Sequence, residues 1–148
     1  MKVIVRSSSL LLTFVAIMSN AKLGRVEAAL RRGIVGRLRI GMSLKQLLQD
    51  AQPATVDHSD EKTVKLYFNP DTGDPPALSA DITNGSVSQF QVLSGNFRTD
   101  IGIGVGATVE DLSNFYEIAW REPDFAYVDS LKMRFEIRDG KVASILVS

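Results

Sequence analysis

A short pattern that occurs twice constrains this chain more than any other feature of its sequence. Residues Gly41–Leu47 (GMSLKQL) return as Gly106–Leu112 (GATVEDL). Each copy is followed, after a spacer, by an apolar strand pattern, a tight-turn pair and a second strand pattern. One such helix-plus-hairpin unit cannot bury its own apolar face and needs a twin beside it. The sequence therefore predicts two tandem repeats, 38–93 and 104–148, within a single domain over residues 38–148.

Each repeat begins with the signals of a short helix. Ser43 and Thr108 fit the N-cap position, because a hydroxyl there accepts hydrogen bonds from the free N–H groups of the first turn. Gln46 completes a capping box in the first copy, and Asp111 takes that place in the second. The expected buried stripes are Leu44, Leu47 and Leu48 in the first helix, and Val109, Leu112, Phe115 and Tyr116 in the second.

The strands that follow alternate between apolar and polar residues. Asn84-Gly85 and Asp139-Gly140 suit the hairpin turn with two positive φ angles. After each turn the apolar spacing is three and then two, which predicts a bulge at Ser88-Gln89 and another at Ala143-Ser144. The expected fold class is α+β, with an antiparallel sheet of about six strands and the short helices on one face.

The first residues have the composition of a secretory signal. Lys2 and Arg6 precede the apolar run Leu10–Met18, and Ser19-Asn20-Ala21 fits a cleavage site. The apolar run is too short for a membrane span, which needs about 20 residues. We expect residues 1–21 to be a signal peptide and the protein to be periplasmic or secreted; the alternative is a buried N-terminal strand.

Charge divides the chain into a basic beginning and an acidic body. From residue 40 onward nine basic residues stand against sixteen acidic ones, which disfavours nucleic-acid binding. Residues 22–37 form a basic amphipathic segment, whose apolar positions predict a helix over Lys22–Ile34. We hypothesise peripheral membrane contact through this segment, as against a helix docked on its own domain or a frayed tail. The contact residues would be Lys22, Arg25, Arg31 and Arg32.

Three patterns suggest a cofactor, catalytic or metal site, and for each of them a role in packing or in a surface loop is the better explanation. Gly102-x-Gly104-x-x-Ala107 fits a dinucleotide fingerprint but not its βαβ context, so we interpret the glycines as a close approach of backbone to helix. The only histidine, His58, lies in a polar loop beside Asp57, Ser59 and Asp60, where a triad rarely assembles. The stretch with Asn69, Asp71 and Asp74 fails the calcium-loop spacing. With no cysteine either, we expect no catalytic residue, metal site or cofactor.

Trp120, Arg121 and Tyr127 are the candidate binding residues. A Trp beside an Arg, just beyond a short helix, is a plausible anchor for a protein partner. The alternative for Trp120 is a lid on the core.

The spacing G-[IV]-G-x-[ST]-x-x-[DE]-L at Gly104–Leu112, with the strand–Asp-Gly–strand ending, resembles small exported bacterial proteins of the SmpA/OmlA and β-lactamase-inhibitor-protein-like kind. The resemblance implies helix-plus-sheet units, sometimes duplicated, and binding to other envelope proteins. This chain lacks both the lipobox cysteine of the first group and the disulfides of the second.

These observations favour a non-enzymatic exported envelope protein that binds a protein partner, in an inhibitor-like or assembly role. One alternative is a periplasmic module that binds a small ligand or lipid. Another is an enzyme whose site is assembled only in the folded chain.

Overall fold

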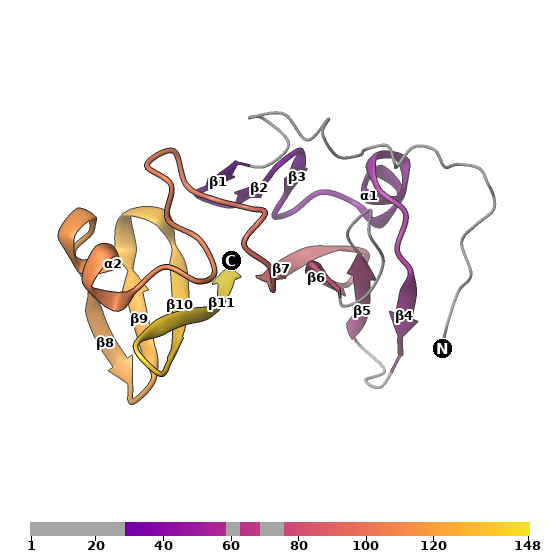
Figure 1. The fold of residues 1–148 in the computed structure, drawn as a ribbon. Helices are drawn as coiled ribbons and strands as arrows, with labels where there is room; N and C mark the ends of the chain where they lie inside the picture. Colours follow the sequence, from indigo (N-terminus) through magenta and orange to yellow (C-terminus); the bar gives the residue numbers. More distant parts are fainter. Residues whose placement is uncertain (1–28, 59–62, 69–75) are drawn as a thin grey trace.

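The computed structural model describes residues 29–58, 63–68 and 76–148. They form one long antiparallel sheet, two α-helices and a small second sheet (Figure 1). The elements of the first half are β1 (Leu30–Arg31), β2 (Ile34–Val35), β3 (Leu38–Arg39), α1 (Leu44–Asp50), β4 (Thr55–Asp57), β5 (Thr63–Phe68), β6 (Leu78–Thr83) and β7 (Ser86–Val92). Those of the second half are α2 (Val109–Phe115), β8 (Ala119–Glu122), β9 (Phe125–Val128), a 3-10 turn (Asp129–Leu131), β10 (Met133–Arg138) and β11 (Lys141–Val147).

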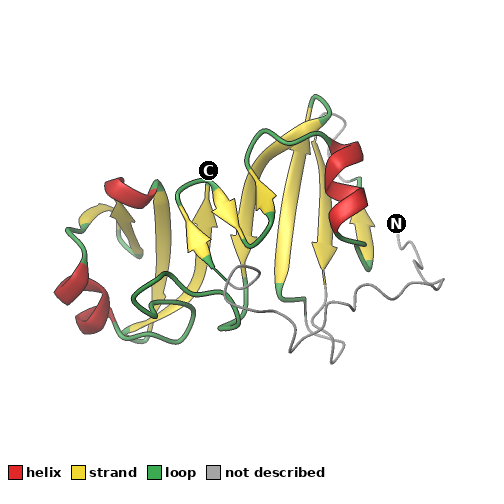
Figure 2. Cartoon of the chain, turned by 90° about the horizontal axis from the view of Figure 1, so that it is seen from above, coloured by secondary structure: helices red, strands yellow, loops and turns green. Residues whose placement is uncertain are grey.

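The long sheet has eight strands in the order β4-β5-β6-β7-β11-β10-β9-β8. The expectation of an antiparallel α+β architecture is confirmed, but the expected six strands were too few. The two strands missed in this sheet, β4 and β8, are its outer edges. Each half contributes a helix followed by a four-stranded meander, and the two helices lie towards opposite ends of the sheet (Figures 1 and 2).

Local chemistry explains both helix starts. The Ser43 hydroxyl accepts from the Gln46 N–H at 3.1 Å, and the Gln46 side chain accepts from the Ser43 N–H at 3.2 Å. Thr108 Oγ1 accepts from the Asp111 N–H at 3.1 Å. Both predicted N-caps are therefore confirmed, but only the Ser43–Gln46 pair forms the reciprocal bonds of a capping box; at α2 only the Thr108 side chain takes part.

The helices bury less than their apolar patterns predicted. Each has only seven residues and one fully buried side chain, Leu47 in α1 and Leu112 in α2. Leu48 and Phe115, expected in the buried stripes, are instead exposed by 44% and 58%.

Both hairpins have the predicted turns and bulges. The φ angles are 54° and 83° at Asn84-Gly85, and 55° and 75° at Asp139-Gly140. The pairing register shifts between Asp81 and Ile82, opposite Ser88, and again between Glu136 and Ile137, opposite Ala143. Each bulge keeps the apolar side chains of its strand on the core face.

The segments before α1 and α2 are hydrogen-bonded to the sheet at equivalent positions in the two halves. Gly41 donates to the Val87 carbonyl at 2.8 Å, and Gly106 donates to the Val142 carbonyl at 2.8 Å. Bridges from Ser43 to Ser86 and from Thr108 to Lys141 follow in each half. β7 and β11 pair with each other only over residues 90–92 and 145–147. The segments before α1 and α2 bond to the beginnings of these two strands, where the strands do not pair with each other.

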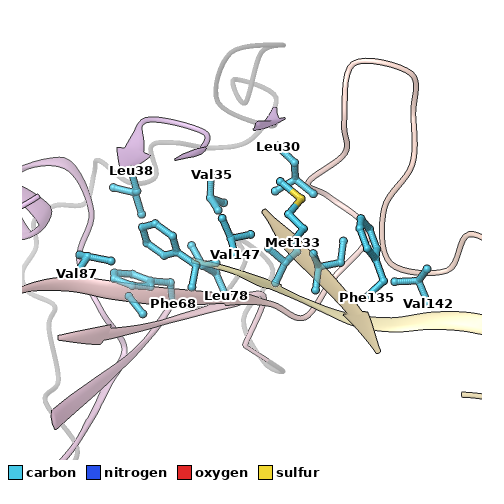
Figure 3. Close-up of a cluster of buried hydrophobic side chains, with 14 of the residues drawn as sticks. Leu30, Val35, Leu38, Phe68, Leu78, Val87, Met133, Phe135, Val142 and Val147 are labelled. Carbon is cyan, nitrogen blue, oxygen red and sulfur yellow. The ribbon is translucent and has the colours of Figure 1, made fainter. Parts of the chain in front are cut away.

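The core lies where the halves meet. Along β7 and β11 the side chains of Phe90, Val92, Ile145 and Val147 have no exposed surface. The small sheet β1-β2-β3 covers them: Leu30, Val35 and Leu38 face Leu78, Met133 and Val147 in Figure 3. Burial of each large apolar side chain stabilises the fold by about 1.5 to 3 kcal/mol.

The small sheet corrects the expected helix over Lys22–Ile34. Within the described part of that segment the chain forms β1 and the start of β2, with Gly33 and Gly36 at positive φ in the turns. Glycine and β-branched residues disfavour a helix here, and the two glycines permit consecutive reversals. Leu30 and Val35 are buried, so the shared core includes residues before Leu38.

Candidate functional site

The predicted binding residues lie on the hairpin at one end of the long sheet. β8 pairs with β9 through Ala119↔Tyr127, Trp120↔Ala126 and Glu122↔Phe125. β8 is the last strand of the sheet, and all four of its residues are exposed. The backbone groups on its outer side are therefore presented at the surface, as at any sheet edge.

Trp120 lies on the same face of the sheet as the core, but past the end of the buried region. Directly opposed residues share a face of an antiparallel pair, and the partner Ala126 is fully buried. The Trp120 side chain is nevertheless 54% exposed. About half of the Trp120 surface therefore remains open to solvent on this face of the hairpin.

Arg121 and Tyr127 are brought together on the opposite face. The register shift between Trp120 and Glu122 makes Arg121 the extra residue of a bulge. Its guanidinium carbon lies 4.4 Å from the centre of the Tyr127 ring, within cation–π range. The three predicted residues thus share one hairpin but not one face.

A second Arg supports this hairpin from β10. Arg134 lies 5.3 Å from the Phe125 ring centre and 3.7 Å from the Glu122 carboxylate. Because both charges are partly exposed, we expect this pair to contribute at most about 1 kcal/mol.

A surface hollow of about 310 Å³ lies at the beginning of β8, and sequence reasoning missed it. Its lining residues are Phe115, Tyr116, Glu117, Asp129 and Ser130. Asp129 forms an exposed ion pair with Lys132 at 3.6 Å. The hollow lies where the end of α2, with Phe115, Tyr116 and Glu117, meets the 3-10 turn after β9, with Asp129 and Ser130.

A polar network crosses the centre of the sheet on the face opposite the core. Gln91 donates to Ser144 at 3.4 Å, and the buried Ser144 hydroxyl donates to Glu136 at 2.8 Å. Arg138 donates to the same carboxylate at 2.6 Å. The Ser144 hydrogen bond, assisted by Arg138, lowers the pKa of Glu136 against the opposing effect of burial.

The glycine-rich stretch serves packing. A Cβ on Gly104 would lie 2.6 Å from the Phe97 carbonyl oxygen, and Gly102 and Gly106 have φ angles of 89° and 98°. The expected close approach is present, but the neighbour is Phe97–Arg98 and not a helix.

The remaining candidates are dispersed or lie outside the described residues. His58 is exposed next to half-buried Asp57, while Ser59, Asp60, Asn69, Asp71 and Asp74 fall in the undescribed segments. Among the described residues no His, Cys, Asp and Glu side chains gather into a metal-binding group. Arg31 and Arg32 are exposed at the β1–β2 turn; Lys22, Arg25 and the expected signal peptide lie outside the described part.

Comparison with known proteins identifies a shared fold. No family model matches the chain, and no curated protein matches it. Among solved structures, the uncharacterised protein YfeY from Escherichia coli is similar with a TM-score of 0.56 and 17% identity, over 82% of this chain and 98% of that one. An extracellular protein containing an SCP domain from Bacillus anthracis str. Ames aligns with a TM-score of 0.49 and 11% identity, over 72% of this chain and 43% of that one. The likeness to YfeY shows the fold alone.

Proposed function

We propose that this protein is a non-enzymatic binding protein of the bacterial envelope, which holds a protein partner against the β8 edge of its sheet. One observation carries the proposal: Trp120 is 54% exposed on an edge strand whose four residues are all exposed.

An aromatic ring at such a position has a physical use in binding. Trp combines a large apolar area with low conformational entropy, and it is enriched where a few residues supply most of the binding energy. Phe115, 58% exposed, lies five residues earlier in the chain. Both would gain from being covered by a partner.

Export belongs to the same proposal and is supported by the basic, apolar and small-residue succession in residues 1–21. Among the described residues no helix is long and apolar enough to cross a membrane. An envelope role also agrees with the resemblance of the Gly104–Leu112 motif to SmpA/OmlA-like and inhibitor-like proteins.

We further propose that the two halves are duplicated units with complementary surfaces. Matching hydrogen bonds before α1 and α2 support this, as does the pairing of β7 with β11. There Val92 opposes Ile145, Phe90 opposes Val147, and Gln91 opposes Leu146. In the two repeats Phe90, Gln91 and Val92 correspond to Ile145, Leu146 and Val147. Exchanging the halves therefore turns the pair Val92–Ile145 into Val147–Phe90 and leaves Gln91–Leu146 in place, as a local two-fold axis at Gln91 and Leu146 requires.

The test compares captured partners of matched variants. Purified wild-type protein, Trp120→Ala and Leu48→Ala are each cross-linked in an extract of the bacterial envelope. Leu48 is the control, because it is an exposed apolar residue (44%) in the other half. We expect a defined cross-linked partner with the wild type and Leu48→Ala, and at least about a tenfold loss with Trp120→Ala. Equal capture by all three proteins would contradict a role for the β8 edge.

A further inference from the structure

The β8 edge offers a template for another strand. β8 terminates the eight-stranded sheet and, within the described residues, pairs only with β9. The other terminal strand, β4, has three residues, all half-buried. Free edges are usually shortened, bulged, or blocked by charged side chains or Pro. β8 has four residues, a bulge and the charged side chains of Arg121 and Glu122, so an added strand would have to be short.

The charge around this edge is slightly acidic, with four carboxylates (Glu117, Glu122, Asp124 and Asp129) beside three basic side chains (Arg121, Lys132 and Arg134). Glu117 precedes β8, Glu122 ends it, and Asp124 lies in the turn to β9. In the described part of the chain Glu122 pairs with Arg134, whereas the Glu117 and Asp124 side chains have no ion pair. The guanidinium of Arg121, the only basic group on β8, lies on the Tyr127 ring. A partner segment bearing positive charge is therefore favoured.

The hollow beside β8 has the composition that suits a basic side chain. Phe115 and Tyr116 provide rings against which an aliphatic stem can pack, and Glu117 provides a carboxylate for its charged end. Asp129 provides a second carboxylate, which is shared with its exposed ion-pair partner Lys132. The hollow adjoins the first pair of the hairpin, Ala119↔Tyr127, since Asp129 follows β9 directly. A side chain from an added strand would enter it at the beginning of β8.

From these features we infer that the β8 edge binds an extended, basic segment of a partner protein, which adds as a ninth strand and places a Lys or Arg side chain in the hollow. Backbone hydrogen bonds would supply affinity and the hollow would supply specificity, as in other cases of strand addition. This inference rests on the proposed function and specifies its partner.

The test uses a capped soluble peptide of alternating lysine and valine as the probe. Trp120 is the only tryptophan, so its fluorescence reports on the edge directly. We expect binding with a shift of emission to shorter wavelength, and weaker binding as salt is raised. A peptide of alternating glutamate and valine, and a lysine–valine peptide N-methylated on two consecutive central residues, should not bind. Equal binding of the N-methylated peptide would exclude strand addition.

Matched protein variants separate the hollow from general charge. Glu117→Gln with Asp129→Asn should raise the Kd for the lysine–valine peptide about fivefold or more. Asp50→Asn with Asp100→Asn removes the same charge from exposed positions elsewhere, and should leave the Kd nearly unchanged. Equal effects of the two double variants would overturn the assignment of the hollow.

Two further outcomes have defined meanings. A dimer of the protein alone in sedimentation, dissociated by Trp120→Ala, would make a second copy the occupant and overturn the basic-segment inference. If envelope capture depends on Trp120 but no lysine–valine peptide binds, the proposed function stands and strand addition fails. If capture is also independent of Trp120, both fail.

Discussion

Single residues decide how each hairpin of this protein turns. Gly85 and Gly140 have φ angles of 83° and 75°, and a Cβ at either would meet no atom within 4 Å. Any penalty for a side chain there arises from the backbone conformation alone, because there is no neighbour to displace.

We expect Gly85→Val and Gly140→Val each to lower the free energy of unfolding by about 1 to 2 kcal/mol. Urea denaturation measures this. Lys141→Val is the control, since it places the same side chain in the adjoining strand, and it should change stability little. A midpoint for Gly140→Val equal to that of the wild type would contradict the requirement for positive φ.

The hydrogen bond from Ser144 to Glu136 predicts a pH-dependent stability. A carboxyl whose pKa is lowered by folding stabilises the native state above its unfolded pKa, and this contribution is lost as pH falls through the folded value. Ser144→Ala should raise the pKa of Glu136 and cost about 1 to 2 kcal/mol at neutral pH. The difference from wild type should shrink below the folded pKa.

Carboxyl NMR titration and urea unfolding at neutral and acidic pH measure both effects. Ser86→Ala, on a neighbouring strand, serves as the control and should leave the Glu136 titration unchanged. A stability difference between Ser144→Ala and wild type that does not vary with pH would refute the linkage.

The residues that could be predicted from the sequence are those whose conformation depends on their neighbours in the chain. The turn glycines and the caps depend on neighbours in the chain, so their types reveal them. Phe115 and the hollow could not be predicted this way. Whether that ring is buried depends on where β9 and the 3-10 turn pass, which spacing along the chain does not contain.

At the scale of elements, the two caps allow a direct comparison of the helices. Ser43→Ala and Thr108→Ala should each lower the free energy of unfolding by about 1 kcal/mol, because each removes an acceptor for a first-turn N–H. Ser113→Ala, inside α2 and exposed, is the matched control. It should be neutral or slightly stabilising, since alanine favours the helix. Thermal unfolding of the three variants tests this, and equal losses in all three would exclude a specific effect of the caps.

The elements that were predicted correctly are those with a buried stripe. β6, β7, β10 and β11 alternate because one face lies on the core, and this alternation is visible in the sequence. β8 has four exposed residues and β4 has only three residues in all, so neither carries such a pattern. The small sheet was mistaken for a helix because Leu30 and Ile34 are as compatible with helical spacing as with two short strands.

At the scale of the whole molecule, the β7–β11 contact makes the halves interdependent. Phe90 and Ile145 have no exposed surface, and they lie on the two strands through which the halves pair. We therefore expect a single cooperative unfolding transition. Trp120 fluorescence reports on the second half, and NMR signals of Leu78 report on the first. Their urea midpoints should coincide, and separated midpoints would show two independent domains.

The place of β11 has a consequence for synthesis. It is the last strand of the sheet to emerge, whether from the ribosome or from an export channel, yet it occupies a central position between β7 and β10. Until it emerges, both neighbours have unsatisfied edges, and Phe90 and Phe135 have no β11 side chains to pack against. Such a nascent chain cannot reach its native pairing early and exposes strand edges that invite aggregation. Rapid completion of the last hairpin would shorten this exposure, and a chaperone covering the open middle of the sheet would protect it until then.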